Sequence, residues 1–170
     1  VTLPDGITII DTEKSDQQEE RIQFFEAKLS HKNPTEAQLI ELSKNPLMTA
    51  GWLVATDEAD GAVAGSIAST PDVIRASLRT IGTSEGGKLI SSTFLMELTD
   101  GSVLTYADCG VVPYPDAAQL AEIAIASGTT HKALTGEDPR IAFLSFSTKG
   151  SASHEKVDLV KNAFEIAQEK

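Results

Sequence analysis

Hydroxyl side chains and one arginine lie close together around a helix start between residues 66 and 75. The hydroxyls belong to Ser66, Ser69 and Thr70. Hydroxyls and the free amides of a helix N-terminus suit an anion, and the guanidinium of Arg75 adds a planar, permanent positive charge for phosphate. The pattern therefore predicts an anion-binding corner of an α/β enzyme. The alternative is a surface ion pair between Asp72 and Arg75, which are three residues apart on one helix face.

Two further segments carry polar or reactive side chains after a predicted strand. Asp108-Cys109-Gly110 follows one strand, where α/β folds place ligand contacts, although an aspartate there also suits a cap of the next turn. Cys109 has no neighbouring base in the sequence, so a thiol beside the site is favoured over a catalytic thiol. In the second segment, Ser147, Thr148 and Lys149 form either a phosphate cradle or a plain strand-to-helix loop.

Metal chemistry is weakly indicated. Asp57, Glu58 and Asp60 are too close in sequence to enclose an ion without other ligands, and Asp60-Gly61 is a common turn. The sequence also holds no zinc-ligand spacing, P-loop, Rossmann glycine fingerprint or nucleophile elbow. We therefore expect no metal and no bound cofactor.

The elements that must position these residues alternate between strand and helix. Strands are predicted at 7–10, 62–65, 89–98, 103–107 and 141–146, with a hairpin turn at 99–102. Helices are predicted at 17–29, 70–82 and from 34, 113 and 153 onward, whereas 47–55 suits a helix or a buried strand. This order predicts an α/β fold with a mixed, mostly parallel sheet. The glycine-rich bend at 82–87 suggests parts of two α/β domains, 1–82 and 83–170.

Composition indicates an ordinary globular protein. Of 170 residues, 41% are hydrophobic and 23% charged, and the net charge of −11 argues against non-specific nucleic-acid binding. We expect no membrane span, because no apolar run approaches about 20 residues. A single cysteine and no recognisable leader suggest the cytoplasm. The chain begins without methionine and ends within a helical pattern, so we expect it to be part of a longer protein.

Three ordered segments resemble the phosphate acetyltransferase family, which also includes butyryl transferases. The matching segments are 57–75, Tyr106-Ala-Asp-Cys-Gly-Val-Val-Pro-Tyr-Pro115 with the helix at 119–124, and Arg140-Ile-Ala-Phe-Leu-Ser-Phe-Ser-Thr-Lys-Gly-Ser151. The resemblance implies two α/β domains of the isocitrate/isopropylmalate dehydrogenase type with the active site between them. In that family an arginine matching Arg75 is implicated in binding phosphate-bearing substrates, and Ser66, Ser69 and Thr70 line the same corner. Cys109, Ser147, Thr148 and Lys149 are expected to line the site or contact coenzyme A.

The resemblance further implies reversible acetyl transfer between acetyl-CoA and phosphate, giving acetyl phosphate and coenzyme A, which is a substrate here. The thiolate can attack acetyl phosphate directly, without a covalent enzyme intermediate. The family's Ser-Arg pair and aspartate, implicated in binding and thiol deprotonation, have no match in this sequence, so the chain by itself is expected to be inactive. We expect a homodimer. The alternative function is the acetyl-CoA-sensing, phosphotransacetylase-like domain of a malic enzyme.

Overall fold

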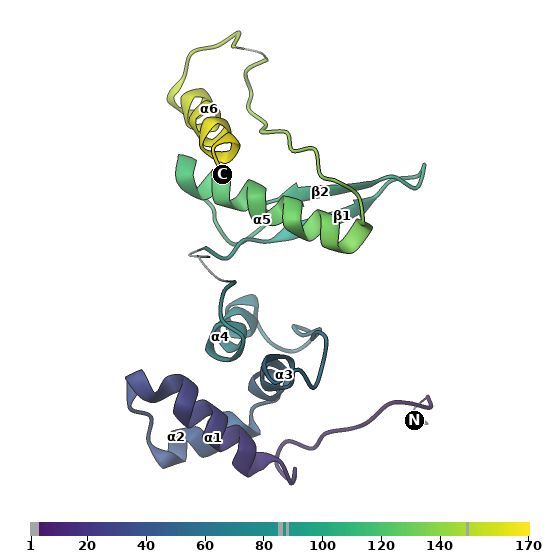
Figure 1. Cartoon of the computed structure of the whole chain (residues 1–170), viewed down its shortest axis with the longest axis vertical. Coiled ribbons are helices and arrows are strands. Elements are labelled where there is room, and N and C mark those ends of the chain that lie inside the picture. The colour runs from purple at the N-terminus through teal and green to yellow at the C-terminus, as the bar shows by residue number, and fades with distance from the viewer. Residues whose placement is uncertain (1–3, 85–86, 88, 149) are drawn as a thin grey trace. The chain divides into compact units, whose positions relative to one another are not determined.

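The computed structural model describes residues 4–84, 87, 89–148 and 150–170 (Figure 1). The chain divides into two compact units, residues 1–84 and 85–170, which are described here one at a time. The first unit is built from helices, and the second combines a small antiparallel sheet with two helices. The coarse prediction of an α/β protein is therefore confirmed, while the assignment of 1–82 and 83–170 to two α/β domains stays a prediction.

Local sequence signals set the boundaries of the helices in the first unit. These are α1 (Gln18–Leu29), the short 3-10 helix η1 (Ser30–Lys32), α2 (Glu36–Lys44), α3 (Pro46–Ala55) and α4 (Thr70–Thr80). A capping box begins α2, where Thr35 and Gln38 exchange side-chain and backbone hydrogen bonds. Asn45 ends α2 and caps α3 by accepting from the amides of Leu47 and Met48. The undecided segment 47–55 is therefore helical.

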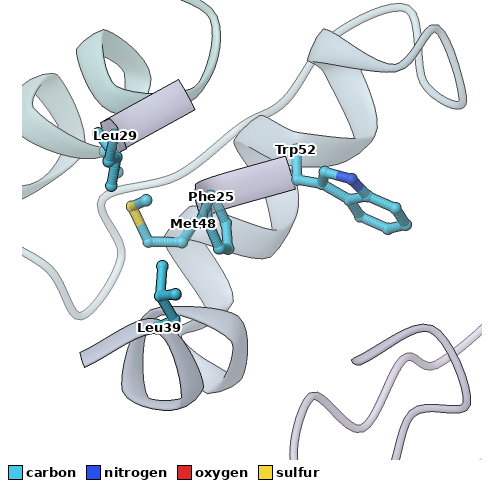
Figure 2. Packing of buried hydrophobic residues seen from close by; sticks show 6 residues of the cluster. Phe25, Leu29, Leu39, Met48 and Trp52 are labelled. Carbon is cyan, nitrogen blue, oxygen red and sulfur yellow. The ribbon is translucent and has the colours of Figure 1, made fainter. Parts of the chain in front are cut away.

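The core of the first unit joins α1, α2, α3 and α4. Its buried members are Phe25, Leu29, Leu39, Met48, Trp52 and Ala76, five of which are labelled in Figure 2. Each of the larger side chains contributes about 1.5–3 kcal/mol by leaving water. Helices α3 and α4 pack closely because Gly51 has no side chain: a Cβ there would lie 2.1 Å from the Thr80 hydroxyl oxygen. The core thus fixes the helix that carries Arg75.

Arg21 anchors the segment before α1 to this unit. Its side chain is fully buried, and it donates hydrogen bonds to the carbonyl oxygens of Ser43 and Thr12 and to the Ser15 hydroxyl. Its guanidinium carbon also lies 5.7 Å from the centre of the Trp52 ring. Burial lowers the pKa of Arg21. The hydrogen bonds offset the desolvation of this charge and hold the segment against α1 and α2.

The second unit places a hairpin against a long helix. Strands β1 (Thr93–Glu97) and β2 (Val103–Ala107) pair antiparallel, with Leu95 opposite Thr105. The predicted turn is confirmed, and there Asp100 accepts from the amide and hydroxyl of Ser102. Helix α5 (Ala117–Thr135) packs against β2 and against α6 (Glu155–Gln168). No helix in the described part of the chain is long and apolar enough to cross a membrane.

Several predicted strands are absent from the structure. Residues 7–10, 62–65 and 141–146 are described but are not assigned to any sheet, and the strand predicted at 89–98 is limited to Thr93–Glu97. The only sheet among the described residues is the antiparallel pair β1–β2, so the predicted parallel sheet is not seen. The physical reason is that a strand exists only through hydrogen bonds to a neighbour, and these apolar segments have no ladder partner among the described residues. They remain exposed, as at Ile9, Val63 and Leu144.

Candidate functional site

The predicted anion-binding corner forms the N-terminal end of α4. Ser69 is the N-cap residue, and its hydroxyl accepts a hydrogen bond from the amide of Asp72. Thr70 is the first helical residue, and Ser66 lies in an exposed bend before it. We call residues 66–75 the α4 corner. It presents hydroxyls and first-turn amides at the positive end of a helix, which is the arrangement that attracts an anion.

Arg75 already has a carboxylate partner in this corner. Its Nη2 lies 2.5 Å from Oδ1 of Asp72, and the two side chains are 58% and 50% exposed. The Ser69 hydroxyl and then the Arg75 guanidinium lower the pKa of Asp72. The surface ion pair considered from the sequence is therefore present. A phosphate at the α4 corner has to share Arg75 with Asp72 or replace that carboxylate as its partner.

The acidic turn before the corner does not gather into a metal site. Glu58 instead accepts hydrogen bonds from Gln17 Nε2 and the Thr56 hydroxyl. Among the described residues, no group of three or more histidine, cysteine or acidic side chains is arranged to hold a metal ion.

In the second unit, Asp108 organises the turn that follows β2. Its Oδ2 accepts from the amides of Gly110, Val111 and Val112 at 3.2, 2.9 and 2.8 Å. Its Oδ1 accepts from the amide and hydroxyl of Ser92 at 2.5 and 2.7 Å. Partial burial raises the pKa of Asp108, but these hydrogen bonds outweigh it and hold the pKa well below its usual range. The interpretation of Asp108 as the cap of the next turn is confirmed. We call residues 108–112 the Asp108 turn.

Cys109 is held inside this turn by the same serine. The Ser92 hydroxyl accepts from the amide and from the thiol of Cys109, both at 3.3 Å. The thiol is half-buried, and its recorded partner is this hydroxyl rather than a base. Ser92 was not singled out from the sequence, because a serine just before a strand carries no signal that identifies a partner 16 residues further along.

The loop after the segment 141–146 satisfies its own polar groups. The Ser147 amide donates to the Ser145 hydroxyl, and the Ser147 hydroxyl accepts from the amide of Ala152. The amide of Thr148 donates to the hydroxyl of Ser151. These bonds are compatible with a plain loop, and the alternative of a phosphate cradle at Ser147, Thr148 and Lys149 stays a prediction. Lys149, the third residue predicted there, lies outside the described residues.

A mainly apolar groove of about 330 Å³ joins two of the predicted segments in the second unit. Pro113, Tyr114 and Pro115, which follow the Asp108 turn, form one side of it. The rest comes from Leu120 of α5, from residues 144–146 and from α6, including Phe146 and Lys156. The structure thus brings the second and third sequence segments together along one groove, with Lys156 among its lining residues. The α4 corner belongs to the first unit and is a separate feature.

Comparison with known families and proteins covers nearly the whole chain. Residues 2–170 match the family model described as "Phosphate acetyl/butaryl transferase". A phosphate acetyltransferase of Thermoanaerobacterium thermosaccharolyticum is 41% identical over 165 residues, which are 94% of this chain and 50% of that protein. One of Haemophilus influenzae is 39% identical over 170 residues, which are 100% of this chain and 23% of that protein.

Solved structures agree with the sequence matches. The EutD phosphotransacetylase from Staphylococcus aureus superposes with a TM-score of 0.86 at 36% identity, covering 97% of this chain and 49% of that one. A phosphotransacetylase from Streptococcus pyogenes gives 0.85 at 34% identity, covering 97% and 50%. The chain therefore spans at most about half the length of these relatives. By the extent of these matches, the chain belongs to the phosphate acetyl/butaryl transferase family.

Proposed function

We propose that this chain is part of a phosphate acetyltransferase, which transfers acetyl reversibly between acetyl-CoA and phosphate. The observation that carries the proposal is the 41% identity to a named phosphate acetyltransferase over 94% of the chain. The α4 corner adds chemistry that suits the activity, because both substrates carry phosphate groups and the corner combines a guanidinium with helix N-terminal donors.

The proposed reaction needs positioning and charge stabilisation from the protein. The sulfur of the coenzyme A thiolate attacks the carbonyl carbon of acetyl phosphate and forms the C–S bond. The bond from that carbon to the phosphate oxygen breaks, and inorganic phosphate leaves with its electron pair. The thiol proton passes to a base that we place outside this chain. Arg75 and the hydroxyls of Ser66, Ser69 and Thr70 stabilise the charge that accumulates on the leaving phosphate.

In the second unit, the proposed role is to line the site for coenzyme A. Cys109, Ser147 and Thr148 are assigned to this lining. The observation in support is that residues close to them in the sequence, Pro113–Pro115 and Leu144–Phe146, line one groove. A mainly apolar groove with a lysine among its lining residues is suited to a ligand that has both an apolar arm and phosphate groups.

The finer features of the fold and assembly are proposals as well. We propose a mixed, mostly parallel sheet of the isocitrate/isopropylmalate dehydrogenase type, with residues 1–82 and 83–170 as parts of two α/β domains. The exposed apolar segments 7–10, 62–65 and 141–146 support this, because such segments are stabilised by pairing with further strands. We also propose a cytoplasmic homodimer that uses coenzyme A as substrate and needs no added cofactor.

The activity is tested by following acetyl-CoA formation from acetyl phosphate and coenzyme A. The assay uses the protein as its gene encodes it and, in parallel, the chain of 170 residues. We expect turnover by the protein as its gene encodes it and little turnover by the chain of 170 residues. Tight binding of acetyl-CoA with no turnover by the encoded protein would overturn the proposal and favour a sensor domain. Parallel assays with butyryl phosphate determine the preferred acyl chain, because pocket shape sets this preference.

A further inference from the structure

We propose that Asp108 is a positioning residue that, with Ser92, orients the Cys109 thiol and the wall of the groove toward bound acetyl-CoA. The inference deepens the proposed function and rests on it, because it takes the second unit to bind the coenzyme. Asp108 is not assigned to contact the substrate. It acts through the turn that it holds.

The first step of the argument is the number of donors that one carboxylate satisfies. Asp108 accepts five hydrogen bonds, two from Ser92 and three from consecutive amides of the Asp108 turn. By comparison, the turn aspartate at the hairpin tip, Asp100, accepts two hydrogen bonds among the described residues, from the amide and hydroxyl of Ser102. The carboxylate of Asp108 therefore ties the residue before β1 to the backbone that follows β2.

The second step is the effect on Cys109. The hydroxyl of Ser92 donates to Asp108 and accepts from both the amide and the thiol of Cys109. The Ser92 hydroxyl thus links the Asp108 carboxylate to the Cys109 sulfur, so the position of the carboxylate affects that of the thiol. If the carboxylate no longer holds Ser92, the half-buried thiol loses an acceptor of fixed position.

The third step leads from the turn to the groove. Val112, whose amide donates to Asp108 at 2.8 Å, directly precedes Pro113. Pro113, Tyr114 and Pro115 line the groove, and Asp116 then caps α5 by accepting from the amide of Gln119. The two prolines have restricted backbone angles. The groove wall is therefore a short, stiff segment fixed at one end by Asp108 and at the other by the start of α5.

The test uses Asp108→Asn in the protein as its gene encodes it, with labelling by N-ethylmaleimide as the readout. An asparagine side chain has one acceptor oxygen, so in either orientation its NH₂ group faces amide donors of Ser92 or of the turn. The loosened turn is expected to raise the labelling rate of Cys109, the only cysteine of these 170 residues, by about tenfold or more. Any cysteine outside them is first replaced. Acetyl-CoA, which has no free thiol, is expected to slow labelling of the wild type. For Asp108→Asn, the acetyl-CoA concentration that halves the labelling rate is expected to be about tenfold higher.

The matched control is Asp100→Asn, which removes the other carboxylate that caps a serine turn and should leave the labelling rate and the half-protection concentration unchanged. Ser92→Ala, which removes the hydroxyl and keeps the amide, replaces Asp108→Asn if that variant does not fold. Its labelling rate and its half-protection concentration are both expected to rise, by less than in Asp108→Asn. A folded variant with a lower melting temperature but unchanged labelling and half-protection would overturn the proposal. So would the absence of any protection of the wild type by acetyl-CoA. These readouts need no turnover, so a protein that binds acetyl-CoA but lacks transferase activity refutes only the proposed function.

Discussion

Arg75 and Asp72 form an ion pair of 2.5 Å on the first turns of α4, beside the hydroxyl of the helix cap. The cation that suits a phosphate is therefore already oriented by a carboxylate. Because both side chains are half-exposed, solvent screens this pair and it contributes little to folding. Arg75 consequently remains available to exchange the carboxylate for a phosphate, which offers more acceptor oxygens.

Replacing Arg75 by alanine is expected to lower kcat/KM for acetyl phosphate. The loss of a charge-assisted hydrogen bond to phosphate corresponds to roughly a tenfold to hundredfold decrease. Arg75→Lys should recover part of it, because an ammonium group lacks the planar fork. Steady-state kinetics measure both effects. The control is Arg79→Ala, one turn further along the same helix and exposed. Equal kinetics for the two alanine variants would remove Arg75 from the site.

Replacing Asp72 by asparagine is expected to strengthen phosphate binding. The change removes a negative charge from the helix end where the anion would bind, and the KM for acetyl phosphate should fall roughly two- to fivefold. Asp158→Asn is the matched control, because Asp158 also lies in a first helical turn and pairs with a cation three residues on, Lys161. A rise in KM for Asp72→Asn would show instead that the carboxylate is needed to orient Arg75.

Gly51 is expected to tolerate no side chain. Gly51→Ala places a Cβ 2.1 Å from the hydroxyl oxygen and 2.9 Å from the Cβ of fully buried Thr80, so α3 and α4 must move apart. The free energy of unfolding should fall by about 1–3 kcal/mol, measured by urea denaturation. At Gly61 an added Cβ has no neighbour within 4 Å, and Gly61→Ala should be close to neutral. Similar losses for both variants would contradict the close packing.

Asp108 is expected to make the free energy of unfolding depend on pH in the acid range. Its pKa is lower in the folded state than the unfolded value of about 3.9, so its contribution is fully present above that value. The contribution is lost as the pH falls toward the folded pKa. The difference in unfolding free energy between wild type and Asp108→Asn should therefore narrow below about pH 4. Urea denaturation between pH 7 and pH 3 measures it. A difference that stays constant over this range would contradict the assignment.

Cys109 is expected to be dispensable for the chemical step. Its thiol bonds to the Ser92 hydroxyl, which is no base, and transfer from acetyl phosphate to coenzyme A needs no second thiol. Turnover of Cys109→Ala should fall by less than about tenfold, roughly the effect of one weak hydrogen bond. Alkylation of the wild type should inhibit by obstruction. Trapping of an acetylated Cys109 during turnover would establish a covalent nucleophile instead.

Local signals in the sequence predicted the helices well. The helices predicted at 17–29 and 70–82 correspond to α1 and α4, and those expected from 34 and 153 begin within two residues of these positions. The helix expected from 113 begins at Ala117, after its cap residue Asp116. The hairpin turn at 99–102 is also present as predicted. The segments 7–10, 62–65 and 141–146, which were predicted as strands, have no ladder partner among the described residues. Alternation and apolar runs indicate a tendency to pair, but they do not identify the neighbouring strand.

By itself the sequence determined most of the helices, the hairpin, the hydroxyl-and-arginine corner at α4 and the likeness to phosphate acetyltransferases, because each depends on residues near one another in the chain or on their order. Only the tertiary structure decided which groups satisfy one another. It brought Ser92 to Asp108 across 16 residues and placed Pro113–Pro115 beside Phe146 along one groove. Such partners depend on the path of the backbone in three dimensions, which cannot be derived from the spacing of residues in the sequence.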